Sequence, residues 1–133
     1  MQESLKSARS IRTFVGAEDF QTSRSFYSEL GFEESTIDEK MSFFKVNSSL
    51  GFYLQDYYVK EWCDNSMVLL EVQDVNDIRK SLIELEIERK YKNVNLLDIR
   101  RNEHGKQIFV YDLSGVLWHF FEFSQKSYSS TWL

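Results

Sequence analysis

Hydrophobic positions change their spacing twice between residues 10 and 32. Residues 11–16 alternate between two faces, which is the period-two pattern of a β-strand. Asp19 then offers a side chain that can cap a helix, and hydrophobic residues recur at near-helical spacing as far as Leu30. Gly31 can take the left-handed conformation that closes a helix. This stretch predicts a strand followed by a capped helix.

The same order occurs a second time from residue 67 onward. Residues 67–72 form another strand-like run, and Asp74 stands where a helix cap is needed. Hydrophobic residues between Val75 and Leu85 fall on one helical stripe, which predicts a second helix. Two strand–helix units therefore organise the chain.

Short strand-like runs separated by polar residues follow each helix. Residues 55–65 show no clean period and predict a connection with room for one helical turn. The predicted order is βαβββ, repeated once, which indicates the α+β fold class. The runs after the two helices are 33–37, 42–46, 51–54, 96–100, 107–111 and 116–123.

We predict one domain over residues 1–133, built from two such modules. Because one helix covers only one face of its sheet, each module leaves a face that must meet something else. Two such faces turned toward each other form a cleft. The predicted parts are module one at about 8–56, a linker at 57–65, module two at about 66–124 and a tail at 125–133.

Composition and charge narrow the possible partners. The aromatic share of 16% predicts either a thick core or an aromatic-lined pocket. The net charge of −5 and the absence of a basic cluster argue against nucleic acid. The single Cys63 excludes an internal disulfide and suits a reducing compartment. With no signal-like start and no long apolar run, the sequence predicts a cytoplasmic protein that does not enter membranes.

Three short groups of residues follow one another along the chain in an order that can be compared with known families. They are Asp19 with Phe26-Tyr27 and Leu30-Gly31-Phe32, then Glu71-Val72-Gln73-Asp74-Val75, and then His104-Gly105, Phe109 and Asp112-Leu113-Ser114-Gly115. Over about 110 residues this pattern resembles the vicinal oxygen chelate superfamily. That superfamily includes glyoxalase I, extradiol dioxygenases, fosfomycin-resistance enzymes and bleomycin-resistance binding proteins. The resemblance implies two βαβββ modules that form an open barrel-like cup with helices outside, in a homodimer.

The resemblance also identifies where metal-dependent members place their ligands. Those four positions correspond here to Arg12, Tyr53, Met67 and His119. An arginine cannot ligate a cation, and a thioether is a poor ligand for Mg, Mn or Fe. We therefore predict no metal and no cofactor. The alternative is a different fourth-strand alignment, in which Gln55 or Asp56 takes part.

A ligand site without metal is the prediction that follows. A few polar groups in an apolar cup are typical of small-molecule sites, and a guanidinium there favours a carboxylate or phosphate. The protein then resembles the bleomycin-resistance binders, with a small organic ligand in the cup. The predicted lining is Arg12, Phe14, Tyr53, Met67, Leu69, His119 and Phe121.

Other interpretations stay open at this point. The protein could be an enzyme of the lyase, isomerase or dioxygenase type, with unrecognised metal ligands or with His119 as general base beside Arg12. It could also be an interaction module with a filled cup, in which Arg12 forms an internal ion pair. His104 is expected in a solvated turn, and Trp118 in the core beneath a helix. Glu86 replaces the glycine that commonly ends the second helix in this superfamily, so we expect that helix end to fray or continue toward Arg89.

Overall fold

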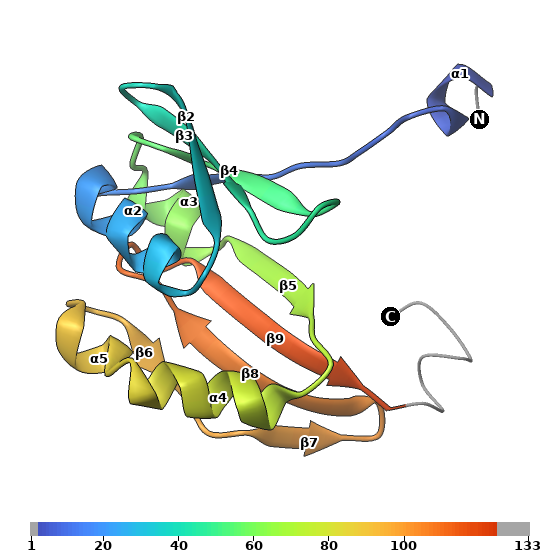
Figure 1. The fold of residues 1–133 in the computed structure, drawn as a ribbon, viewed down its shortest axis with the longest axis vertical. Helices are drawn as coiled ribbons and strands as arrows, with labels where there is room; N and C mark the ends of the chain where they lie inside the picture. The colour runs from blue at the N-terminus through green and yellow to red at the C-terminus, as the bar shows by residue number, and fades with distance from the viewer. Residues whose placement is uncertain (1–2, 125–133) are drawn as a thin grey trace.

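Two β-sheets and the helices beside them make up the fold (Figure 1). The computed structural model describes residues 3–124, so the predicted tail at 125–133 lies outside the described residues. The first sheet has the order β1-β4-β3-β2 and the second β5-β9-β8-β6, with β7 also paired to β8. The strands are β1 Phe14–Gly16, β2 Glu33–Asp38, β3 Met41–Lys45, β4 Gly51–Gln55, β5 Met67–Glu71, β6 Asn95–Leu96, β7 Arg100–Asn102, β8 Gly105–Tyr111 and β9 Leu117–Phe123.

The two sheets are built alike. In each, the first strand of the module runs parallel to the last, β1 beside β4 and β5 beside β9, while the other neighbours are antiparallel. A strand can meet its neighbour in parallel only after a crossover, which the intervening helix and hairpin provide. The predicted fold class, α+β with two βαβββ modules in open sheets, is confirmed.

The helices begin where the sequence places their caps. Asp19 Oδ1 accepts a hydrogen bond from Thr22 N at 3.0 Å, and Asp74 caps the second long helix in the same manner. Gly31, with φ of 100°, follows the first of them. The helices are α1 Glu3–Lys6, α2 Phe20–Glu29, α3 Lys60–Asp64, α4 Val75–Glu84 and α5 Ile87–Lys90.

Three segments differ from the sequence prediction. The run at 96–100 forms two short strands, β6 Asn95–Leu96 and β7 Arg100–Asn102, instead of one. The first strand starts at Phe14 rather than at residue 11. Residues 3–13 precede it as an arm whose α1 end lies away from both sheets (Figure 1), while Thr13 O still accepts a hydrogen bond from Tyr53 N of β4. The second long helix does not continue toward Arg89. It ends at Glu84, because Glu86 takes the left-handed conformation with φ of 54°, and α5 starts afresh after it.

One hydrophobic core joins the two modules. The rings of Phe52 from β4 and Trp118 from β9 lie 5.1 Å apart, and Tyr27 from α2 contacts both. Trp118 is buried beneath the helices, as predicted. Each sheet therefore turns one face to a shared interior, and we call the opposite side of each sheet its open face.

A buried hydrogen-bond network crosses this core. Tyr27 OH donates to Asp112 Oδ2 at 2.5 Å and accepts from Trp118 Nε1 at 2.9 Å. The backbone N–H groups of Ser114 and Val116 donate to Asp112 Oδ1, each at 2.9 Å. Burial and the Asp112 carboxylate raise the pKa of Tyr27 well above its ordinary value. The network ties α2 of the first module to the turn before β9 of the second.

Within residues 3–124, no helix has the length and apolar character that crossing a membrane requires.

Candidate functional site

The open face of the first sheet carries an aromatic cluster around Arg12. Arg12 Nη1 donates to Tyr53 OH at 3.1 Å, and the guanidinium carbon lies 4.8 Å from the ring centroid of Phe43. Phe14 stacks on Tyr53, with centroids 4.8 Å apart and planes 15° apart. We call Arg12, Phe14, Phe43 and Tyr53 the arginine platform. Its strands alternate, so Phe52 and Leu54 point into the core while Tyr53 points out.

Arg12 has no acidic partner in the described part of the chain. None of the ion pairs within residues 3–124 includes it, and its side chain is exposed. The internal ion pair that the filled-cup interpretation needs is therefore not formed among these residues. A guanidinium that rests on aromatic rings keeps its remaining N–H groups available to an anion.

The sequence analysis did not identify Phe43 or Gly51 as part of the surroundings of Arg12. A Cβ atom at Gly51 would lie 2.8 Å from the backbone oxygen of Phe44 and closer still to the ring of Phe43. The missing side chain of Gly51 thus leaves the space in which the Phe43 ring lies beneath Arg12. A glycine inside a strand signals such a close approach, but it does not tell which side chain fills the space.

A second cluster occupies the open face of the second sheet, around His119. Its Nε2 lies 3.4 Å from Met67 Sδ, and its Nδ1 lies 3.4 Å from Gln107 Oε1. The Phe109 ring meets the imidazole edge to face at 4.8 Å. Leu69 is opposite His119 in the register of β5 with β9. Phe121 is buried and packs against Phe123, with centroids 4.4 Å apart.

Burial lowers the pKa of His119, so the imidazole is neutral at pH 7. We expect an NMR titration of its ring to give a pKa below the ordinary value of about 6.5. Because the unfolded chain then binds the proton more readily, the free energy of unfolding should fall as pH drops below about 7. The His119→Gln variant should lose that share of the pH dependence. A pKa above the ordinary value would contradict the burial of this ring.

The seven predicted site residues fall into two groups. Arg12, Phe14 and Tyr53 lie together on the first sheet. Met67, Leu69, His119 and Phe121 lie on the second. No hydrogen bond, ion pair or ring contact within residues 3–124 joins one group to the other. Exposed fractions of 54% for Phe14, 67% for Met67 and 53% for Leu69 show that each open face carries large apolar side chains exposed to solvent.

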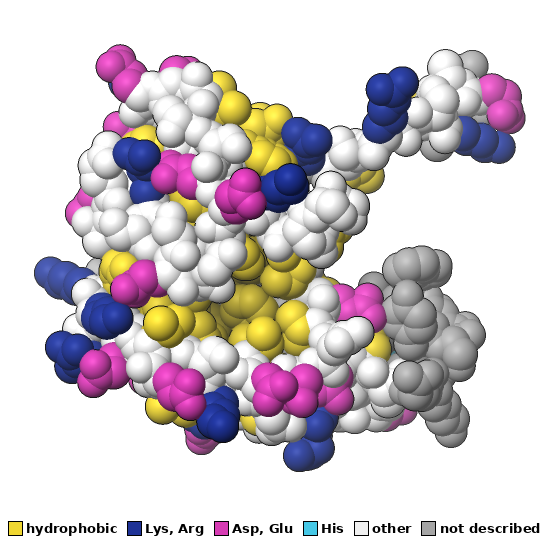
Figure 2. Space-filling view, in the orientation of Figure 1, with side chains coloured by type: hydrophobic (Ala, Val, Ile, Leu, Met, Phe, Trp, Pro, Cys, Tyr) yellow, Lys and Arg dark blue, Asp and Glu magenta, His cyan; other side chains and the backbone are white. Residues whose placement is uncertain are grey.

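A cleft of about 540 Å³ lies beside the arginine platform, between the two sheets. Figure 2 shows hydrophobic side chains gathered in the hollow between the upper and lower halves. Arg12 and Leu69 are the two predicted site residues that line it, and Phe52 and Trp118 contribute from the core. The arm supplies residues 10–13 of one wall, and β5 supplies residues 68–71 of the other.

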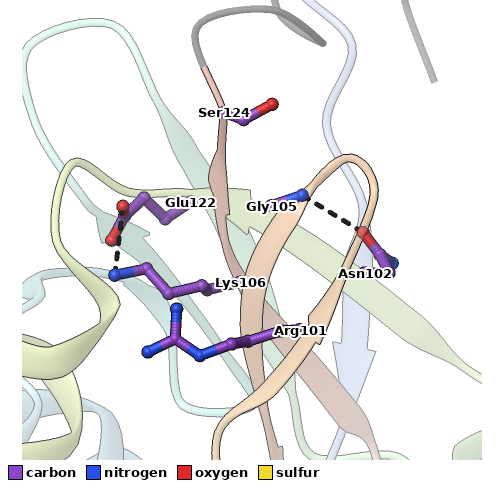
Figure 3. Close-up of a pocket in the computed structure, with 6 residues that line it drawn as sticks. All are labelled: Arg101, Asn102, Gly105, Lys106, Glu122 and Ser124. Atoms are coloured by element: carbon purple, nitrogen blue, oxygen red, sulfur yellow. Dashed lines mark hydrogen bonds and ion pairs between the residues drawn. The ribbon is translucent and has the colours of Figure 1, made fainter.

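A smaller cavity of about 270 Å³ lies at the β7–β8 hairpin (Figure 3). Its Lys106 is neutralised by Glu122, with Nζ and Oε2 3.6 Å apart, and Glu122 Oε1 also accepts from the N–H of Val75 at 3.0 Å. Glu122 thereby holds the start of α4 against the sheet. His104 lies in the turn of this hairpin, where Nε2 is 3.5 Å from Glu103 Oε1.

The donor groups around His119 do not fit a divalent metal. Its two ring nitrogens contact a thioether sulfur and an amide oxygen. No group of three or more His, Cys, Asp or Glu side chains comes together within residues 3–124. The alternative fourth-strand alignment names Gln55 and Asp56. Gln55 lies opposite Met41 and Gly16 in the first sheet, and Asp56 belongs to no such group within residues 3–124.

Comparison with known proteins finds similarity in structure alone. No family model matches the sequence, and no curated protein matches it. Among solved structures, the bleomycin resistance determinant encoded on transposon Tn5 gives a TM-score of 0.72 at 15% identity, over 86% of this chain and 98% of that one. The bleomycin-binding protein of Streptomyces verticillus, complexed with copper(II)-bleomycin, gives a TM-score of 0.69 at 17% identity, over 88% of this chain and 99% of that one.

A third similar structure comes from a metal-containing protein. The fosfomycin resistance protein FosX of Listeria monocytogenes, complexed with Mn(II) and sulfate, gives a TM-score of 0.69 at 15% identity, over 91% of this chain and 94% of that one. At these identities the similarity shows the fold. The chain thus has the fold of the vicinal oxygen chelate superfamily, which its sequence motifs predicted.

Proposed function

We propose that this protein binds a small organic anion without a metal ion, and that Arg12 holds the anionic group. The observation that carries the proposal is an exposed guanidinium with no carboxylate partner in residues 3–124, held by Tyr53 OH and the Phe43 ring. Arginine presents a planar fork of donors that matches a carboxylate or phosphate with two parallel hydrogen bonds.

The surroundings of Arg12 suit an organic molecule rather than a bare ion. The adjoining cleft has the volume of a small-molecule site and is lined by Leu69, Phe52 and Trp118. Structures of this fold include complexes with copper(II)-bleomycin and with sulfate, so the fold accommodates small ligands in other proteins. For this chain, the donor set described above supports binding without metal.

We also propose a homodimer in which a second copy covers the open faces. Phe14, Met67 and Leu69 are each more than half exposed, and large apolar side chains on both sheets need a cover. Pairing the arginine platform of one copy with the His119 cluster of the other brings all seven predicted residues to one site. The buried Cys63, with no disulfide in residues 3–124, is consistent with the cytoplasm as the proposed location.

An enzyme with His119 as general base is the second candidate. Its lowered pKa keeps the imidazole unprotonated at pH 7, as a base requires. Its Nε2 faces the thioether of Met67, however, and a ligand would have to displace that contact. Turnover that is lost in His119→Gln while binding persists would favour this candidate.

Replacing Arg12 tests the proposed function. We expect Arg12→Met to weaken binding of a small anionic ligand by roughly 10- to 100-fold, because a charge-assisted pair of hydrogen bonds is lost. The free energy of unfolding should change by less than about 1 kcal/mol, since the side chain is exposed. Thermal shift and titration calorimetry with benzoate, phenyl phosphate and inorganic phosphate measure both quantities.

The matched control is Arg101→Met, which removes the same charge from the hollow at the β7–β8 hairpin. It should leave anion binding unchanged. If the wild-type protein binds none of these anions, or if Arg12→Met and Arg101→Met bind them equally, the proposed function is wrong.

A further inference from the structure

We infer that the ligand is an aromatic carboxylate, whose ring stacks on Phe14 while its carboxylate binds Arg12. This inference rests on the proposed function, since it names the chemical class of the anion that Arg12 holds. The geometry of the arginine platform carries it, together with the exposure of one aromatic face.

Phe14 offers a flat apolar surface on which a second aromatic ring can stack. One face of its ring is covered by the nearly parallel Tyr53, at 4.8 Å and 15°, yet 54% of the residue is exposed. The supporting stack fixes the orientation of the Phe14 ring. A planar ligand ring can therefore extend the stack at little conformational cost.

Arg12 and Phe14 are spaced for one molecule to reach both. They are two residues apart on one segment, and both contact Tyr53 on the open face: Arg12 Nη1 donates to its hydroxyl at 3.1 Å, and Phe14 stacks on its ring. The segment is already held to β4 before the strand begins, because Tyr53 N donates to Thr13 O at 3.0 Å. A fused two-ring carboxylate would place its rings over Phe14 and direct its carboxylate past the Tyr53 hydroxyl to the guanidinium of Arg12.

Gly51 and Phe43 act as positioning residues for the guanidinium. Continuing the β1–β4 register from Phe14 opposite Tyr53 brings Arg12 opposite Gly51. The Phe43 ring fills the space above Gly51, and the guanidinium lies over that ring at 4.8 Å. The charge is thereby held on the same side as Phe14. This arrangement gives Gly51 a role that its place in the strand alone does not reveal.

Other ligand classes use only part of the platform. An aliphatic carboxylate satisfies Arg12 and leaves the Phe14 face uncovered, while a neutral aromatic molecule covers Phe14 and leaves the guanidinium without an anion. Within residues 3–124 no acidic side chain pairs with Arg12 and competes with a ligand carboxylate. The combination of ring and charge therefore selects for an aromatic acid.

Three probes, each titrated into the full chain, distinguish the contribution of the aromatic ring to affinity from that of the negative charge. They are 2-naphthoate, cyclohexanecarboxylate and 2-naphthylmethanol. We expect 2-naphthoate to bind about five-fold or more tightly than cyclohexanecarboxylate, and 2-naphthylmethanol to bind weakest. Phe14→Leu should bring the two carboxylates to similar affinity, mainly by weakening 2-naphthoate. The control Tyr57→Leu removes an exposed ring that lies tilted against Trp62 elsewhere on the chain, and should keep the preference.

The positioning of the Arg12 guanidinium is tested with Gly51→Ala and Phe43→Leu. Both should weaken all carboxylates, because both disturb the support beneath Arg12. Phe43→Leu serves as the second variant if Gly51→Ala, whose new Cβ approaches backbone, fails to fold. Unchanged affinity in a folded Phe43→Leu protein would overturn the positioning role.

The outcomes distinguish the inference from the proposed function. If the wild type binds both carboxylates equally and Arg12→Met loses both, the aromatic class is wrong and the anion site stands. If Phe14→Leu keeps the full preference for 2-naphthoate, the aromatic class is likewise wrong. If 2-naphthylmethanol binds as tightly as 2-naphthoate, or if no carboxylate binds, the proposed anion site is wrong as well.

Discussion

Replacing Asp112 by alanine is expected to lower the free energy of unfolding by about 4 kcal/mol. The change removes the acceptor for Tyr27 OH and for the backbone N–H groups of Ser114 and Val116, all within the core. Each buried donor left without an acceptor costs the free energy of its lost hydration, and these costs accumulate in one place. Urea unfolding at pH 7, followed by tryptophan fluorescence at a fixed protein concentration, measures the loss.

Two further variants identify the source of that loss. Tyr27→Phe keeps the backbone donors on Asp112 but leaves Trp118 Nε1 without its acceptor, so a smaller loss of about 1–2 kcal/mol is expected. Asp98→Ala removes an exposed carboxylate that pairs with Arg79, and should change the free energy by less than about 0.5 kcal/mol. A loss in Asp112→Ala no greater than in Asp98→Ala would show that the network does not stabilise the fold.

Met67→Glu is expected to convert a dimer to monomers. By the dimer proposal, the wild-type protein sediments at twice the chain mass of 15.9 kDa. Met67 lies on the open face of the second sheet, and a carboxylate there must lose its hydration when a second copy covers that face. In a symmetric dimer the cost arises twice, so the dissociation constant should rise about 100-fold or more.

The control for this experiment is Ile83→Glu. Ile83 is also a large exposed hydrophobic residue, but it lies on α4, on the helix-covered side of the second sheet. That variant should remain a dimer in sedimentation velocity experiments. A monomeric wild-type protein, or equal dissociation of the two variants, would contradict the proposed covering of the open faces.

Local signals explain why much of the fold could be predicted from the sequence. Asp19 and Asp74 cap helices through hydrogen bonds to residues two or three positions ahead, so a short window of sequence contains the whole interaction. The alternation that buries Trp118 and turns His119 outward is equally local. The assignment of predicted site residues to the open faces follows from that alternation.

Contacts between distant segments could not be predicted in the same way. The space above Gly51 is filled by Phe43 because β3 and β4 pair in one particular register, which no single window of sequence specifies. The bond from Tyr27 to Asp112 joins residues that are 85 positions apart. The predicted start of the first strand was too early. Residues 11–13 alternate, but the paired strand begins at Phe14, and before it one backbone hydrogen bond, from Tyr53 N to Thr13 O, continues the pairing with β4.

The shared interior has a consequence for how such a chain can vary. Two repeats of one design could in principle accept substitutions independently, each within its own sheet. Here the rings of Phe52 and Trp118 are neighbours, and Tyr27 from the first repeat hydrogen-bonds to Asp112 in the second. A change of size or polarity on one side therefore needs a matching change on the other. A recombinant that exchanges one module alone would keep only one partner of each of these contacts. The two repeats are therefore expected to be inherited and altered together.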